Sequence, residues 1–280
     1  MTRASSPLSL DTLAKGYIFD IDGTLALADR HLSGYEALPG AIELIELLQE
    51  RKTPFVAFTN GSTKTPTQLS SALKAAGFNI PPYQALTPPS VAVSLFKSKG
   101  YKRLLVLGTE GVWRPLADAG LDIVVSPERA DDADAVLIGW YPEFRLADLE
   151  AACRAVWNGA GLYTVSTAPF LASREGRTLG ISGALTAAVS SVTGAQATIV
   201  GKPAAAAFEV ARSLLGLHAQ EIAIVGDDLS LENAMAHENG AISVGVHTGL
   251  ASPQEIADLP AKLQPHYSLA GVNELLALIR

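Results

Sequence analysis

Short runs of consecutive apolar residues recur along the chain, separated by segments with helical periodicity. A run that is apolar throughout, without polar residues in alternation, is typical of a strand buried on both faces in a parallel sheet. The runs that we predict to be strands are Tyr17–Phe19, Phe55–Phe58, Leu104–Leu107, Ile123–Val125, Ala135–Ile138, Leu162–Val165, Thr198–Val200, Ile222–Val225 and Ile242–Val246. Such strands alternating with helices predict an α/β protein.

The segments between the strands carry recognisable helix ends. In Thr65–Ala76 the threonine is an N-cap residue, Pro66 occupies the first helical position and Gly77 ends the helix. The other helices predicted with clear ends are Ala41–Glu50, Arg145–Trp157 and Pro203–Leu215.

A proline-rich stretch marks the predicted domain boundary. Asn79–Pro89 reads N-I-P-P-Y-Q-A-L-T-P-P, and its four prolines interrupt any regular element. We interpret the following hundred or so residues as an inserted module that returns near Arg174–Gly183. The prediction is a catalytic core of residues 1–81 and 181–280 and an inserted α/β cap of residues 82–180.

Composition narrows the classes of partner and the compartment. The net charge of −7 argues against nucleic acid, because binding to a polyanion normally rests on Lys and Arg. Cys153 is the only cysteine, so no internal disulfide requires an oxidising compartment. Pro7 and Asp11 interrupt the N-terminus, which does not resemble a signal peptide, and no apolar stretch is long enough to span a membrane. We expect a cytoplasmic protein with a small-molecule partner, and a homodimer is left open.

Polar residues of the kind that chemistry uses follow four of the predicted strands. They are Asp20 and Asp22, Thr59-Asn60-Gly61, Gly201-Lys202-Pro203, and Gly226-Asp227-Asp228. In an open parallel sheet ligands bind outside the carboxyl ends of the strands, so these residues are expected to meet in one pocket. Carboxylates with a lysine and a hydroxyl suit a divalent cation plus a phosphate, and Mg²⁺ prefers such oxygen ligands.

The D-x-D segment suggests a division of chemical labour. Asp20, at the tip of a strand, is placed to attack phosphorus and form an aspartyl-phosphate. Asp22, on the same side, could protonate the leaving oxygen and then deprotonate the hydrolytic water. Gly23 allows a sharp turn there. Lys202, the Thr59 hydroxyl and N–H groups near Gly23 and Gly61 could hold the phosphate oxygens.

These motifs resemble those of a known superfamily. F-D-I-D-G-T-L is similar to the first motif of the haloacid dehalogenase-like (HAD) hydrolases, Thr59-Asn60 to the second, Lys202-Pro203 to the third and G-D-D-L-S-L-E to the acidic fourth. The insertion resembles a class IIA cap, that of the NagD and 4-nitrophenylphosphatase-like branch. The resemblance spans nearly the whole chain. It implies a Rossmann-like core, a cap domain, magnesium and phosphomonoester hydrolysis.

The resemblance also assigns roles to individual residues. It implies that Asp20 is the nucleophile and a metal ligand, and that Asp22 is the acid/base and binds metal through its carbonyl. Thr59, Asn60 and Lys202 are implied to hold phosphate. Asp227 is implied to be a metal ligand.

This chain departs from the family pattern at two places. Where the fourth motif usually has a second aspartate the chain has Glu232, which could reach metal-bound water, and Asp228 is the competing candidate. The cap has Ser166-Thr167-Ala168-Pro169 in place of T-N-P-D, so no relative's substrate is carried over. Trp140 and Arg174 are the cap residues that we expect could contact substrate.

Two other functions remain open at this point. A metal-independent haloacid dehalogenase would share the fold, but its motif lacks the second acid that Asp22 supplies. A non-catalytic protein that binds a phosphoryl ligand is the other alternative, for which Glu232 is the hint. The sequence contains no P-loop, no dinucleotide fingerprint and no nucleophile elbow.

Overall fold

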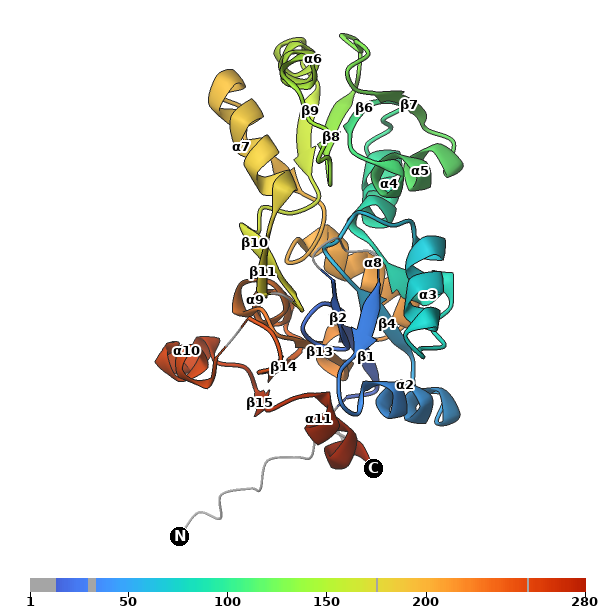
Figure 1. Ribbon diagram of the computed structural model, residues 1–280, viewed down its shortest axis with the longest axis vertical. Helices are drawn as coiled ribbons and strands as arrows, with labels where there is room; N and C mark the ends of the chain where they lie inside the picture. The colour runs from blue at the N-terminus through green and yellow to red at the C-terminus, as the bar shows by residue number, and fades with distance from the viewer. Residues whose placement is uncertain (1–13, 30–33, 175, 251) are drawn as a thin grey trace.

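A computed structural model describes residues 14–29, 34–174, 176–250 and 252–280 of the chain (Figure 1). In this part of the chain most strands belong to two parallel sheets, which lie toward opposite ends of the molecule. The sheet near the C-terminus is the core sheet, and the other is the cap sheet. The segment that we expected not to be a signal peptide lies outside the described residues, except for its last two positions.

The core sheet has the strand order β15-β14-β13-β1-β4-β5, and every pair in it is parallel. Its strands are β1 (Gly16–Phe19), β4 (Phe55–Phe58), β5 (Ala85–Leu86), β13 (Ile222–Gly226), β14 (Ile242–Val246) and β15 (Tyr267–Leu269). Alternate residues of β1 point to opposite faces of the sheet: Tyr17 and Phe19 pack in one apolar cluster, and Ile18 packs in the other. The sheet is therefore buried on both sides, as its continuous apolar runs predict.

Helices cover both faces of the core sheet. The cluster around Phe19 includes residues of α2 (Ala41–Glu50), α3 (Pro66–Ala75) and α11 (Val272–Ile279). The cluster around Ile18 includes residues of α8 (Ala205–Leu215) and α9 (Ala234–Asn239). The remaining short elements near this sheet are η1 (Pro82–Gln84), η2 (Ala219–Glu221), η3 (Leu229–Asn233), α10 (Pro253–Asp258) and η4 (Ala261–Leu263).

The cap sheet has the order β12-β9-β8-β6-β7 and is also parallel throughout. Its strands are β6 (Arg103–Leu107), β7 (Asp122–Val125), β8 (Ala135–Ile138), β9 (Gly161–Thr164) and β12 (Thr198–Ile199). On one face lie α6 (Leu146–Trp157) and α7 (Ile181–Thr193), and on the other lie α4 (Pro88–Ser98) and α5 (Glu110–Asp118). The cap is thus a small α/β layer structure with its own apolar interior.

Two antiparallel hairpins meet between the sheets. The core hairpin pairs β2 (Ala26–Ala28) with β3 (Tyr35–Ala37), and the cap hairpin pairs β10 (Phe170–Ser173) with β11 (Gly176–Leu179). The Arg174 N–H donates to the Ala28 carbonyl at 2.9 Å, which joins the tip of the cap hairpin to the core hairpin. Figure 1 shows β10 and β11 in the space between the two sheets.

The predicted strands and helices agree with the structure to within two residues. Each of the nine predicted strands is present, and the helix predicted from Pro203 begins at Ala205. The α3 start is as expected, since the Thr65 side chain accepts the Gln68 N–H at 3.2 Å. The sequence patterns did not predict the strands of either hairpin, and they also missed β5 and β15.

Sheet membership differs from the division at residues 82 and 180. Ala85–Leu86 pairs with β4 in the core sheet, and Thr198–Ile199 pairs with β9 in the cap sheet. The cap sheet therefore includes a strand beyond residue 180, because α7 packs on α6 and leads into β12. Whether residues 82–180 fold as a unit stays a prediction.

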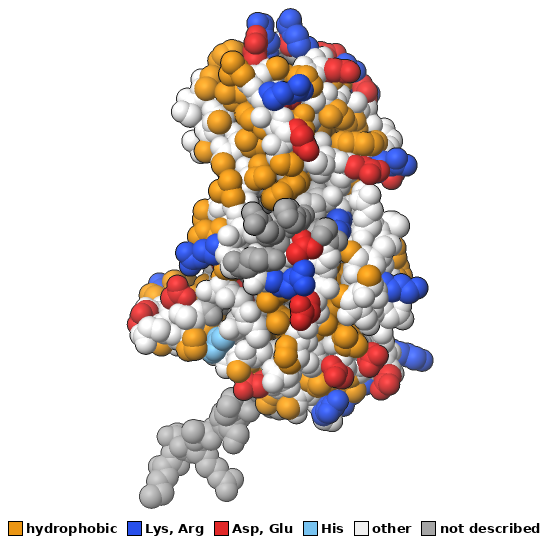
Figure 2. All heavy atoms as spheres, viewed as in Figure 1, with side chains coloured by type: hydrophobic (Ala, Val, Ile, Leu, Met, Phe, Trp, Pro, Cys, Tyr) orange, Lys and Arg blue, Asp and Glu red, His pale blue; other side chains and the backbone are white. Residues whose placement is uncertain are grey.

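On the face in Figure 2, acidic and basic side chains are interspersed, with no large field of one sign. Among the described residues, no helix combines the length and apolarity needed to cross a bilayer.

Candidate active site

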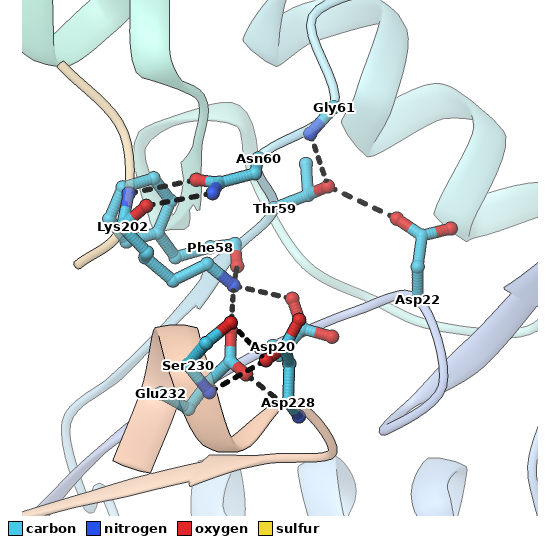
Figure 3. A network of polar contacts seen from close by, with 10 residues as sticks. All are labelled: Asp20, Asp22, Phe58, Thr59, Asn60, Gly61, Lys202, Asp228, Ser230 and Glu232. Atoms are coloured by element: carbon cyan, nitrogen blue, oxygen red, sulfur yellow. Dashed lines mark hydrogen bonds and ion pairs between the residues drawn. The ribbon is translucent and has the colours of Figure 1, made fainter. Parts of the chain in front are cut away.

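The strand register brings the polar ends of three core strands to one level. Phe19 lies opposite Val225 of β13 and Ala57 of β4, so the residues that follow these strands emerge together. Asp20, Thr59 and Asp227 are at most 7% exposed there. Lys202 reaches the same place from the segment after β12 and is 1% exposed (Figure 3).

Lys202 is the centre of the polar network in Figure 3. Its ammonium makes a short ion pair with Asp20 Oδ1, lies 2.7 Å from Glu232 Oε1 and donates to the Phe58 carbonyl at 2.6 Å. Burial by itself lowers the pKa of Lys202, but Asp20 and Glu232 outweigh burial and raise it above its usual value. Lys202 is therefore a permanent cation beside Asp20.

Asn60 holds the main chain of Lys202. Its Oδ1 accepts the Lys202 N–H at 2.8 Å, and its Nδ2 donates to the Lys202 carbonyl at 2.9 Å. Both ends of the amide are thus engaged within the protein. The Asn60 side chain therefore positions Lys202, and the expectation that Asn60 holds phosphate stays a prediction.

Thr59 and Gly61 form a second chain of contacts that leads to Asp22. The Gly61 N–H donates to Thr59 Oγ1 at 2.8 Å, and the Thr59 hydroxyl donates to Asp22 Oδ2 at 3.1 Å. The Gly23 N–H likewise has an internal acceptor, the Ala26 carbonyl at 2.9 Å. These two N–H groups have acceptors within the protein, and phosphate binding by N–H groups near Gly23 and Gly61 stays a prediction.

Asp22 has one oxygen fixed and one without a partner. Thr59 holds Oδ2, whereas Oδ1 is buried and has no hydrogen-bond partner among the described residues. Burial, followed by the charge of Asp20, raises the pKa of Asp22 to about 7. A carboxyl group with this pKa can both give and take a proton near neutral pH, as a general acid and base must.

Asp227 completes the acidic group. Its Oδ2 accepts the Leu250 N–H at 2.7 Å, and burial followed by the charge of Asp20 raises its pKa well above the usual value. Gly23 has a φ of +97°, and a Cβ atom at this position would lie 2.5 Å from Asp227 Oδ2. A side chain at residue 23 would therefore displace this carboxylate, which explains the glycine after D-I-D.

Glu232 and Asp228 lie side by side but have different partners. Glu232 is 2% exposed, pairs with Lys202 and accepts the Asp228 N–H at 3.2 Å. Asp228 Oδ1 accepts from Ser230 N and Oγ at 2.7 and 2.6 Å and so caps η3. A Cβ on Gly226 would lie 2.1 Å from Glu232 Cγ, so the glutamate packs directly against the end of β13.

The donor set is consistent with a divalent cation. No three acidic, histidine or cysteine side chains among the described residues are arranged around a common point. Magnesium needs fewer, since it is usually held by one or two carboxylates together with water and phosphate oxygens. Asp20 and Asp227 could supply those carboxylates, and the repulsion between them, which contributes to the raised pKa of Asp227, is what a bound cation would relieve.

The two cap residues expected near substrate lie in different places. Trp140 lines the cavity above the acids, and its N–H donates to Ser62 Oγ at 3.0 Å. The Arg174 guanidinium instead lies 3.3 Å from Glu36 and 3.7 Å from Asp29, both in or beside the core hairpin. Arg174 therefore joins the hairpins, and it does not line the cavity.

Sequence reasoning missed two aromatic residues of the cavity, Tyr35 and Phe170. Tyr35 is on β3 and Phe170 is on β10, the hairpins that were not predicted. Only the meeting of these hairpins brings the two rings to the acids, and no motif or periodicity in the sequence signals it.

Comparison with known proteins places the chain in a family. A profile of haloacid dehalogenase-like hydrolases matches residues 17–122, and a second HAD-like hydrolase profile matches residues 199–275. An acid sugar phosphatase of Staphylococcus epidermidis is 30% identical over 266 residues, which span 94% of this chain and 97% of that protein. The chain is a phosphatase of the HAD family.

Solved structures agree with the family in fold. The 4-nitrophenylphosphatase of Thermotoga maritima superposes on this HAD phosphatase with a TM-score of 0.85 at 25% identity, covering 97% of this chain and 99% of that one. The glycerol phosphate phosphatase Rv1692 of Mycobacterium tuberculosis, in complex with magnesium, gives 0.83 at 26% identity, covering 95% and 78%. The predicted α/β fold and the NagD and 4-nitrophenylphosphatase-like branch are confirmed.

Proposed function

We propose that this HAD phosphatase hydrolyses small phosphomonoesters with magnesium through an aspartyl-phosphate on Asp20. The observation that carries the proposal is the burial of Asp20 beside a permanent cation, Lys202, with Asp22 Oδ1 close by, which has no hydrogen-bond partner within the described part of the chain. Asp20 and Asp227 would hold the cation with the Asp22 carbonyl. When bound, magnesium would neutralise these carboxylates and phosphate oxygens.

The first half of the reaction transfers the phosphoryl group to the protein. A carboxylate oxygen of Asp20 attacks phosphorus and forms a new P–O bond, while the bond from phosphorus to the leaving-group oxygen breaks. The carboxyl proton of Asp22 passes to that oxygen, so the product leaves as a neutral alcohol. The Asp22 pKa of about 7 keeps the proton available near neutral pH.

The second half reverses the roles. Asp22, now ionised, takes a proton from water, whose oxygen attacks phosphorus. The P–O bond to Asp20 breaks, inorganic phosphate forms and Asp20 returns as a carboxylate. Lys202 holds Asp20 in place throughout. Asn60 holds Lys202, and Thr59 holds Asp22.

The test combines turnover with detection of the intermediate. We expect 4-nitrophenyl phosphate to be hydrolysed with added magnesium and not in excess chelator. Acid-quenched protein should carry a phosphoryl group on the peptide that contains Asp20. Asp20→Asn should lose both turnover and the phosphoryl group, whereas Asp118→Asn, which changes an exposed aspartate of the cap, should keep both. Turnover in chelator, or in Asp20→Asn, would refute the mechanism.

A further inference from the structure

The cavity beside the acids has a wall that is mainly apolar. It encloses about 820 Å³, including the part open to solvent. Trp140 after β8, Phe170 of β10 and Ile181 at the start of α7 line it from the cap, and Tyr35 lines it from the core hairpin. Each of these four side chains is only half-buried, so each still presents surface to whatever enters.

Three serine hydroxyl groups of this wall are withdrawn from the cavity. Ser62, Ser166 and Ser182 are only 3%, 6% and 7% exposed. The oxygen of Ser62 accepts the Trp140 N–H, that of Ser166 accepts the Ala168 N–H at 3.1 Å, and the Ser182 hydroxyl donates to the Ser166 carbonyl at 2.9 Å. These serines build the wall, and most of the surface it presents comes from aromatic and aliphatic side chains.

The charges around the cavity are acidic. Among the described residues that line it there are five carboxylates and no Lys, Arg or His. The Lys64 ammonium lies beside this lining, 5.5 Å from the centroid of the Tyr35 ring, and is attracted by Asp22. Arg177 lies in the neighbouring depression, where its guanidinium stacks 4.2 Å from the centroid of the Phe170 ring and is attracted by Glu255. Burial followed by the charge of Asp22 raises the pKa of Tyr35 well above its usual value, so the phenol stays neutral.

We propose that this phosphatase selects phosphomonoesters whose leaving group is uncharged and has an apolar body about the size of a phenyl ring. The proposal rests on the proposed function and adds the substrate class. An apolar body gains by leaving water for the surfaces of Trp140, Phe170 and Ile181. A second anion on the leaving group would be buried near these carboxylates, and the two cations beside the cavity, Lys64 and Arg177, are already attracted by Asp22 and Glu255.

Three substrates with the same intrinsic reactivity test this preference. They are 3-phenylpropyl phosphate, n-propyl phosphate and a pentanoate phosphorylated on its terminal hydroxyl, all esters of unactivated primary alcohols. We expect kcat/KM with magnesium to be at least about tenfold higher for the phenylpropyl ester than for the propyl ester. Added methylene groups in an apolar pocket change kcat/KM by factors of this size. The phosphate ester that carries a carboxylate, called here the carboxylate ester, should have a kcat/KM at least about tenfold lower than that of the propyl ester.

Variants locate the preference on the wall. Phe170→Ala should lower kcat/KM for the phenylpropyl ester at least about tenfold and for the propyl ester much less. Ile181→Lys places a cation on the wall, and we expect it to raise kcat/KM for the carboxylate ester at least about tenfold. The matched control is Trp157→Ala, which removes an aromatic side chain that is 62% exposed on α6 and should leave all three values unchanged.

The outcomes separate this proposal from the one on which it rests. Equal kcat/KM for the three esters, with normal hydrolysis, would overturn the substrate class and leave the phosphatase mechanism intact. Preference for the carboxylate ester that is lost in Arg177→Met would overturn it and assign selection to Arg177. If neither these esters nor 4-nitrophenyl phosphate is hydrolysed, the proposed function itself fails.

Discussion

Replacing Glu232 by glutamine should stabilise the metal-free protein, and should do so mainly at high pH. Glu232 is buried, and burial outweighs the opposing effect of Lys202 and raises its pKa from 4.5 to about 7. An acid with a raised pKa in the folded state binds its proton more tightly there than in the unfolded chain. Stability is therefore lost as pH rises from about 4.5 to about 7.

The size of the effect follows from the pKa change. One pKa unit corresponds to about 1.4 kcal/mol, so ionised Glu232 lowers the free energy of unfolding by about 3 kcal/mol at pH 8 and by about 1 kcal/mol at pH 5. Glutamine has nearly the same shape, can still accept from Lys202 and has no charge to bury. The gain in the free energy of unfolding from Glu232→Gln should therefore be about 2 kcal/mol larger at pH 8 than at pH 5.

The assay is urea unfolding in chelator at both pH values. All three tryptophans, Trp113, Trp140 and Trp157, lie within or beside elements of the cap, so tryptophan fluorescence reports unfolding of the cap. Far-ultraviolet circular dichroism reports unfolding of the core as well. Glu46→Gln, at an exposed position on α2, is the matched control and should show the same small effect at both pH values. An equal effect of Glu232→Gln at pH 5 and pH 8 would refute the reasoning.

Three further outcomes are expected. Asp22→Asn should lower kcat by about 10²–10⁴-fold for alkyl phosphates and less for 4-nitrophenyl phosphate, whose leaving group needs no proton. Equal losses of kcat for the two kinds of substrate would exclude Asp22 as the general acid. Asn60→Ala removes both bonds to the Lys202 main chain, so urea unfolding should be easier by about 2 kcal/mol and KM should rise; unchanged values would mean that Lys202 is held without it. Magnesium should raise the melting temperature more at pH 8 than at pH 5. The pKa values of Asp20 and Asp227 are raised, and both carboxyl groups must ionise to bind the cation. A larger shift of the melting temperature at pH 5 would contradict this ligand set.

The local sequence determined the sheets and the position of the acids. Continuous apolar runs can be satisfied only by strands covered on both faces, so β1, β4 and β13 were predictable, as were the polar residues at their carboxyl ends. The α3 start followed from a side chain and an amide three residues apart. Such features depend on neighbours in the chain, and for that reason they can be read without knowing the fold.

The partners of the polar residues were decided only by the tertiary structure. Asn60 and Lys202 are 142 residues apart, and Lys202 and Asp20 are 182 apart, so no local pattern could show that Asn60 holds the lysine. Arg174 reaches Glu36 because the two hairpins meet, and the same contact brings Tyr35 and Phe170 to the cavity. A motif specifies which chemical groups are present. Which groups satisfy one another depends on burial and distance, and these exist only once the core, the cap and the two hairpins have come together.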